Sequence, residues 1–296
     1  MKKNRRNFDW KPEIIRCLVY FLITAVVSCA VCFRLMNMAD VDRHTISEMS
    51  DRLSTVEEKT ATEPQTQPLY EEFVRDPLYG KKIVYDGDSI AAERDSNGGG
   101  YAALIAAQTG STYENFAVGG AQLCSNDGPH SVVDNLKNLP SDGDLYCFEG
   151  GINDYWANTP LGSCSANDYK GKLNTKTVCG AMETIFRYCM ENFPGKPICF
   201  VIVHKVQNTA TEKNANGDTF GDFRDAMVQV CNKYSVPYYD AFNDSGLNGW
   251  NQTQSDHFLT GNSSNESDGT HPNAEGYKKY YVPQLLELFR KMIPVT

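Results

Sequence analysis

A serine, an aspartate and a histidine in this chain have types and spacing suited to nucleophilic catalysis. Ser89 follows directly on the apolar run 81–86, and Asp268 lies three residues before His271 in the segment "SDGTHPNAEGY" (267–277). A serine hydroxyl becomes a nucleophile when a base takes its proton, and that base needs an acceptor that orients it. Ser89, His271 and Asp268 are therefore candidates for acyl-transfer chemistry.

Two further segments contain groups that could stabilise a developing negative charge. The segment "NFAVGG" (115–120) ends in paired glycines, and "GGINDYW" (150–156) contains Asn153 and Asp154. Preorganised N–H donors stabilise an oxyanion, and a glycine backbone and an asparagine amide supply such donors. Singly, each segment is typical of a turn or a helix cap. We expect Asp154 to make structural hydrogen bonds.

Apolar runs of strand length alternate with segments of helical periodicity over residues 78–296. The predicted strands are 81–86, 112–118, 144–150, 197–205 and 236–242, and the predicted helices are 100–110, 177–195, 218–235 and Asn273 to Met292. This alternation, with near-continuous apolar strands, predicts a parallel sheet of about five strands that is covered on both faces. Sites in such sheets form at the carboxyl ends of the strands, where the candidate residues lie.

The four segments resemble the motif blocks of the GDSL or SGNH hydrolase family in order and spacing. The matching residues are "GDSI" (87–90), "NFAVGG" (115–120), "GIND" (151–154) and "DGTHP" (268–272). The resemblance implies that Ser89 is the nucleophile, that His271 is the general base and then acid, and that Asp268 orients the imidazolium. It also implies an oxyanion hole formed by the Ser89 N–H, the Gly120 N–H and the Asn153 amide. The family fold is a flavodoxin-like three-layer α/β/α sandwich, which agrees with the predicted elements.

Some residues near these segments have more than one interpretation. Gly120, rather than Gly119, fits the last glycine of the family's Asn-x-Gly-x-x-Gly pattern. His204 ends the fourth predicted strand and is a rival base, although it has no carboxylate at a short offset. Tyr155, Trp156 and His204 are candidate substrate contacts, and each could instead be a packing residue.

Asp86 stands where an apolar or small residue is more usual in the family. A second carboxylate near Ser89 would oppose oxyanion formation unless it is paired or points away. Asp86 and Asp88 match the first two ligand positions of a calcium loop, but Ile90 and Ala91 occupy the third ligand position and the glycine position. We therefore predict no metal site, and the sequence indicates no cofactor.

The N-terminal part has the charge pattern of a single membrane anchor. Residues 17–33 carry no charge, and basic residues outnumber acidic ones before them. The positive-inside rule then predicts a cytoplasmic leader (1–13), a transmembrane anchor (14–35), a polar stalk (36–77) and a hydrolase domain outside the membrane (78–296). A cleaved signal peptide and a lipoprotein signal ending at Cys29 are alternatives. We favour the anchor, because the apolar run continues past Cys29.

The chain after the anchor is acidic and contains several cysteines. Residues 36–296 carry 21 basic and 35 acidic side chains, a net charge of −14, which argues against nucleic-acid binding. Seven of the ten cysteines lie in this part, and some, such as Cys147 and Cys199, fall within apolar strand-like runs. We predict that most of them are unpaired core residues.

These features predict a membrane-anchored, extracellular bacterial serine esterase that acts through an acyl-enzyme. We expect a short acyl group, such as acetyl, carried by a polysaccharide, an expectation that rests on surface location and on the breadth of the family. One alternative is an O-acyltransferase on a cell-wall glycan that uses the same residues. The other is a catalytically silent glycan-binding protein, against which the presence of Ser89, Asp268 and His271 argues.

Overall fold

The computed structural model describes residues 75–92, 99–126, 130–164, 171–261 and 266–293. These residues belong to a compact unit that spans Val74–Thr296. The predicted leader, the anchor and the stalk up to residue 74 lie outside the described residues. Within the described ranges, no helix combines the length and the apolar character that crossing a bilayer requires.

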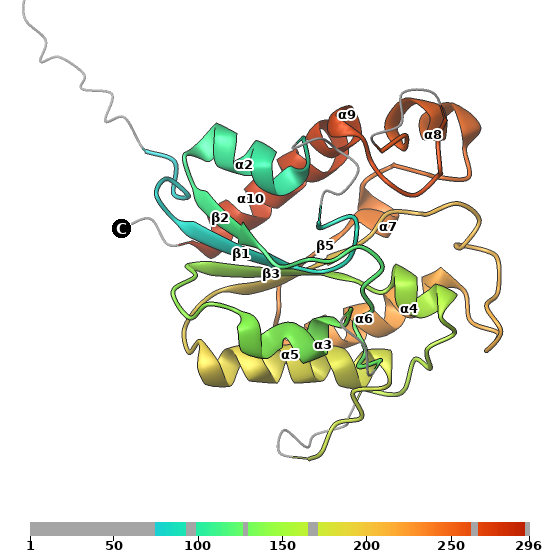
Figure 1. The fold of residues 1–296 in the computed structure, drawn as a ribbon, viewed down its shortest axis with the longest axis horizontal. Coiled ribbons are helices and arrows are strands. Elements are labelled where there is room, and N and C mark those ends of the chain that lie inside the picture. The colour runs from blue at the N-terminus through green and yellow to red at the C-terminus, as the bar shows by residue number, and fades with distance from the viewer. Residues whose placement is uncertain (1–74, 93–98, 127–129, 165–170, 262–265, 294–296) are drawn as a thin grey trace, which may run out of the picture. The chain divides into compact units, whose positions relative to one another are not determined.

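Five parallel strands form a single sheet in the order β2-β1-β3-β4-β5 (Figure 1). The strands are β1 (Lys82–Asp86), β2 (Thr112–Asn115), β3 (Leu145–Gly150), β4 (Ile198–Ile202) and β5 (Tyr238–Asp240). This sheet confirms the predicted fold class. β1, β3 and β4 lie in the interior of the sheet, so their apolar runs are buried on both faces.

β2, β4 and β5 are shorter than the sequence predicts, and the two edge strands, β2 and β5, each end at a side-chain to backbone hydrogen bond. β2 ends at Asn115, whose side chain accepts a hydrogen bond from the Ala117 N–H at 3.1 Å. β5 ends at Asp240, whose side chain accepts from the Asn243 N–H at 3.3 Å. Such local side-chain to backbone bonds turn the chain out of the sheet, so the apolar residues that follow belong to a loop after β2 and to the helix α7 (Ala241–Asp244) after β5.

Helices cover both faces of the sheet and complete the predicted three layers (Figure 1). One face carries α2 (Tyr101–Thr109) and α10 (Val282–Met292), and the other carries α3 (Val132–Asn135), α5 (Val178–Asn192) and α6 (Phe220–Tyr234). The connections contain α4 (Ile152–Trp156), η1 (Leu136–Asn138), α7 (Ala241–Asp244), α8 (Gln252–Phe258) and α9 (Ala274–Gly276). Threonine side chains cap α5 and α6 at their N-termini.

The predicted C-terminal helix contains an irregular turn. A five-residue π-helix, η2 (Tyr277–Tyr281), separates α9 from α10. It carries two buried tyrosines, and the Tyr277 hydroxyl donates to the Ile90 carbonyl oxygen at 2.9 Å. Irregular turns of this kind often lie at functional sites. Here the turn supports the chain directly after Ser89.

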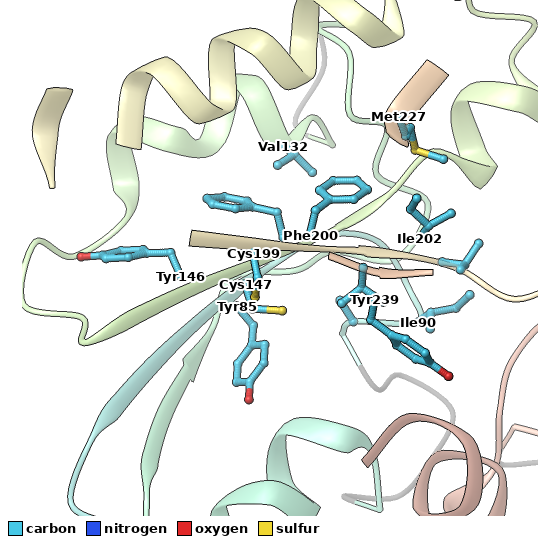
Figure 2. Packing of buried hydrophobic residues seen from close by; sticks show 14 of the residues in the cluster. Tyr85, Ile90, Val132, Tyr146, Cys147, Cys199, Phe200, Ile202, Met227 and Tyr239 are labelled. Carbon is cyan, nitrogen blue, oxygen red and sulfur yellow. The ribbon is translucent and has the colours of Figure 1, made fainter. Parts of the chain in front are cut away.

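Aromatic side chains and cysteines fill the core on both faces of the sheet. Figure 2 shows Tyr85, Phe200 and Tyr239 extending from the strands into this core. Cys147 on β3 pairs in register with Cys199 on β4. All seven cysteines of the described residues are unpaired and six are buried, which confirms the prediction that most are core residues.

Candidate active site

The chain turns sharply between the end of β1 and Ser89. A side chain at Gly87 would come within 2.8 Å of the Glu149 carbonyl oxygen and 2.9 Å of the Ala91 Cβ, so the turn requires glycine. The Asp88 Oδ1 accepts a hydrogen bond from the backbone N–H two residues later, at 2.9 Å. Ser89 is 8% exposed. The turn therefore holds Ser89 at the carboxyl end of β1 with little freedom to move.

The three predicted catalytic residues lie within hydrogen-bonding distance of one another. The Ser89 Oγ is 2.8 Å from the His271 Nε2, and the His271 Nδ1 is 2.5 Å from the Asp268 Oδ2. The other oxygen of Asp268 accepts the backbone N–H groups of Thr270 and His271, each at 2.8 Å. The structure thus brings together residues that are 182 positions apart in the chain.

The charge of Asp268 determines which histidine nitrogen carries the proton. Burial alone would raise the pKa of Asp268, but the hydrogen bonds from the side chain and backbone of His271 outweigh burial and lower it. An ionised carboxylate only accepts hydrogen bonds, so the His271 Nδ1 must donate. In the neutral ring, Nε2 is then the acceptor and faces the Ser89 hydroxyl.

Gln207, in the loop after β4, holds the segment that contains Asp268 and His271. Its side-chain N–H donates to the Asp268 carbonyl oxygen at 2.8 Å and to the Thr270 Oγ1 at 3.3 Å. Its backbone N–H donates to the Gly269 carbonyl oxygen at 3.0 Å. The sequence showed "HKVQN" only as the end of a strand, and these contacts join residues more than 60 positions apart.

The predicted oxyanion donors lie beside the nucleophile turn. The Asn153 side-chain amide, in α4, donates to the Asp88 Oδ2 at 3.2 Å and to the Ala121 carbonyl oxygen at 3.0 Å. Gly120 is exposed, has a φ of +80°, and follows Val118, whose N–H donates to the Gly87 carbonyl oxygen at 3.0 Å. The glycine loop and the Asn153 amide are thus both joined to the turn that carries Ser89.

Glu149, the fifth residue of β3, lies directly under this turn and is fully buried. Its Oε2 accepts the backbone N–H groups of Asp88 and Ala91, both at 3.2 Å. Burial, followed by the nearby Asp88 carboxyl, raises the pKa of Glu149 well above its ordinary value. We did not predict this residue, although a lone acidic residue within the apolar run "LYCFEGG" was a visible signal.

The structure does not support a substrate contact by His204. The residue is 0% exposed, and its Nδ1 is 2.8 Å from the Tyr281 hydroxyl. Burial, followed by the charge of His271, lowers the pKa of His204 to about 3, so the ring is neutral. A buried ring of this kind cannot reach the surface, and His204 packs edge-on against Tyr281.

Tyr155 is also a packing residue rather than a substrate contact. It is 4% exposed, it packs against Phe220 and Phe223, and its hydroxyl donates to the Glu212 carbonyl oxygen at 2.8 Å. Its neighbour Trp156 is 43% exposed and accessible to a ligand.

Asp154 makes the structural hydrogen bonds that we expected. It is fully buried, and its carboxyl oxygens accept the N–H groups of Leu123 at 2.8 Å and Cys124 at 3.2 Å. These bonds hold the chain directly after Gly120.

Asp86, which departs from the family pattern, is hydrogen-bonded to neighbouring groups. Its carboxyl oxygens accept hydrogen bonds from the Gly87 N–H and from the side-chain amide of Asn135, the last residue of α3, both at 2.9 Å. Burial raises its pKa to about 7, against the opposing effect of these bonds. The Asp86 side chain therefore links β1 to α3.

An α/β/α sandwich with a Ser-His-Asp arrangement at the carboxyl edge of its sheet is typical of serine hydrolases that form an acyl-enzyme. Residues 87–279 match the GDSL-like lipase/acylhydrolase family, and the chain belongs to this family. The match includes all four sequence segments and confirms the resemblance on which the sequence interpretation rested. The chain is accordingly a serine ester hydrolase.

Solved structures share the fold at low sequence identity. A protein from Lactobacillus plantarum is 22% identical with a TM-score of 0.60, over 72% of this chain and 98% of that chain. A possible lipase from Chitinophaga pinensis is 18% identical with a TM-score of 0.55, over 71% and 98%. A salicylyl-acyltransferase from a tetracycline biosynthetic pathway is 16% identical with a TM-score of 0.50, over 73% and 56%. Comparison with curated proteins gives no match.

Proposed function

We propose that this chain hydrolyses short-chain carboxylic esters through an acyl-enzyme on Ser89, outside the cell and anchored by residues 14–35. The observation that carries the proposal is the pair of hydrogen bonds that joins Ser89 to His271 and His271 to Asp268, at 2.8 Å and 2.5 Å. This geometry lets one proton move from the serine hydroxyl to the imidazole as the nucleophile attacks.

In the first half-reaction, the Ser89 Oγ attacks the ester carbonyl carbon and its proton passes to the His271 Nε2. Asp268 stabilises the imidazolium that forms. The carbonyl oxygen becomes an oxyanion, which the Ser89 N–H, the Gly120 N–H and the Asn153 amide bind. The intermediate collapses, the carbon–oxygen bond to the alcohol breaks, and the alcohol leaves with the proton from Nε2.

In the second half-reaction, water attacks the acyl group on Ser89 and gives its proton to the His271 Nε2. A second oxyanion forms and collapses, and the Ser89 oxygen recovers the proton as the carboxylic acid departs. The two N–H groups of the Asn153 amide donate to Asp88 and Ala121 in the resting enzyme, so one of these bonds is exchanged for the bond to the oxyanion. The bond that remains keeps the amide beside Ser89.

We propose an acetylated carbohydrate as the substrate. The exposed large hydrophobic side chains of the described residues come from separate segments: Tyr79, Tyr113, Val118, Trp156, Met190 and Trp250. Scattered apolar residues favour a short acyl group over a long chain, which would need a continuous apolar surface. The exposed Trp156, three residues after Asn153, is suited to contact a sugar ring.

The test uses the purified full-length chain with aryl esters of increasing acyl length and with acetylated oligosaccharides. We expect hydrolysis that is fastest for acetate and that Ser89→Ala and His271→Ala abolish. Ser141→Ala is the matched control, because Ser141 is exposed in the turn before β3. Hydrolysis that survives Ser89→Ala would refute the mechanism. Faster transfer to an added sugar than to water would instead identify an acyltransferase.

A further inference from the structure

Two buried carboxyl groups lie in contact under the nucleophile turn. Asp88 and Glu149 are both 0% exposed, and their side chains are within hydrogen-bonding reach of each other. In the described part of the chain, neither forms an ion pair with a lysine or arginine. Two adjacent negative charges without a cation are very unfavourable in a buried site, so at least one carboxyl must hold a proton.

The hydrogen bonds around the pair indicate where that proton lies. Asp88 accepts the Ile90 N–H on one oxygen, at 2.9 Å, and the Asn153 amide on the other, at 3.2 Å. These are bonds to a carboxylate. The Glu149 Oε2 accepts two backbone N–H groups, but within the described residues no group donates to its Oε1. Glu149 is therefore the member of the pair that has an oxygen available to carry the proton.

We propose that Glu149 is a positioning residue, which shares one proton with Asp88 and thereby fixes both the backbone of Ser89 and the amide of Asn153. The proposal rests on the proposed function, because it names what holds the nucleophile and an oxyanion donor in place. Glu149 does not touch the substrate. It acts through the turn at residues 87–91 and through the carboxylate of Asp88.

The protonation state of the Asp88–Glu149 pair limits the pH range in which the site is active. Burial is the main cause that raises both pKa values, that of Asp88 to about 6 and that of Glu149 well above its ordinary value. The neighbouring charges are Asp154, which raises the pKa of Asp88, and His271, which lowers it. The Tyr281 hydroxyl also faces the pair, and its own pKa is raised, first by burial.

The direction of the effect follows from the charge. The pair carries one proton and one negative charge through the neutral range. As the pH rises, the proton leaves and two adjacent carboxylates repel each other, so the Asn153 amide and the Ser89 N–H lose their positions. Activity should therefore decline on the alkaline side while the protein is still folded.

Glu149→Gln tests the shared proton directly, because a glutamine amide donates to Asp88 and accepts from the turn but does not titrate. We expect Glu149→Gln to abolish the alkaline decline in kcat. We expect Glu149→Ala to lower kcat by about 100-fold with little change in KM, since small displacements of reacting groups have effects of this size. The matched control is Glu183→Gln, another buried glutamate, which is on α5 and should leave the shape of the pH profile unchanged.

A second measurement does not depend on ester hydrolysis. Infrared spectroscopy of the folded wild-type chain at neutral pH should show the carbonyl stretches of protonated buried carboxyls, to which Asp86 also contributes. Glu149→Gln should remove one band, and Asp86→Asn should leave that band in place. An alkaline decline that is unchanged in Glu149→Gln, or a carbonyl spectrum that loses no band in this variant, would overturn the proposal. A wild-type chain that shows the band but hydrolyses no ester would overturn the proposed function instead.

Discussion

The side chain of Gln207 donates a hydrogen bond to the carbonyl oxygen of Asp268 at 2.8 Å, from a residue whose φ is +42°. Left-handed backbone of this kind is unfavourable for a residue with a side chain. The strain is maintained by three hydrogen bonds from Gln207 to the loop at residues 268–270. The position of His271 relative to Ser89 therefore depends on Gln207, which lies in the loop after β4.

Removing the Gln207 side chain should lower activity more than stability. We expect Gln207→Ala to reduce kcat by about 10-fold to 100-fold, because Asp268 and His271 lose part of their support. Gln207→Gly should lose the same side-chain bonds but relieve the backbone strain, so it should unfold at a higher temperature than Gln207→Ala. Its kcat should be no higher than that of Gln207→Ala. Steady-state kinetics and thermal unfolding provide these comparisons.

The control for this prediction is Gln229→Ala, which removes an exposed glutamine from α6. It should match the wild type in both measurements. A Gln207→Gly variant with wild-type kcat would show that the loop needs no support from Gln207.

The sequence was sufficient to predict the layers of the fold and the residues at the strand ends. Apolar runs marked the strands, and short motifs with special turn chemistry marked Ser89, Asn153 and His271. The supporting contacts could not be predicted, since Glu149 and Gln207 bind segments about 60 positions away. A polar residue at a strand end can face solvent or the core, and the pattern around His204 and Tyr155 does not distinguish the two.

The Asn153 amide should contribute to the transition state more than to substrate binding. We expect Asn153→Ala to lower kcat by about 10²-fold to 10³-fold with little change in KM, the usual effect of removing one oxyanion donor. The variant also leaves the Asp88 Oδ2 without the amide that now donates to it. Aryl acetate kinetics test this prediction, and a variant with altered KM but unchanged kcat would contradict it.

Asp86 should make stability depend on pH. Its pKa in the folded state is about 7, raised mainly by burial from 3.8, so the folded chain keeps a proton that the unfolded chain releases. Stability should therefore fall as the pH rises from about 4 to about 7, by an amount of the order of a few kcal/mol. Asp86→Asn cannot titrate, so its stability relative to the wild type should increase over the same range.

Urea unfolding at pH 5 and pH 8 measures this difference. Asp256→Asn, on the exposed side of α8, serves as the control and should show no comparable trend. A stability difference between Asp86→Asn and the wild type that stays constant with pH would contradict the buried, protonated state of Asp86.

Mass spectrometry of the full-length chain, quenched in acid shortly after mixing with an aryl acetate, tests directly whether Ser89 carries the acyl group during turnover. We predict one acetyl group on the peptide that contains Ser89, formed and lost at rates that match turnover, and absent from Ser89→Ala. Turnover without an acyl-enzyme, or an acetyl group on another residue that accounts for turnover, would contradict this prediction.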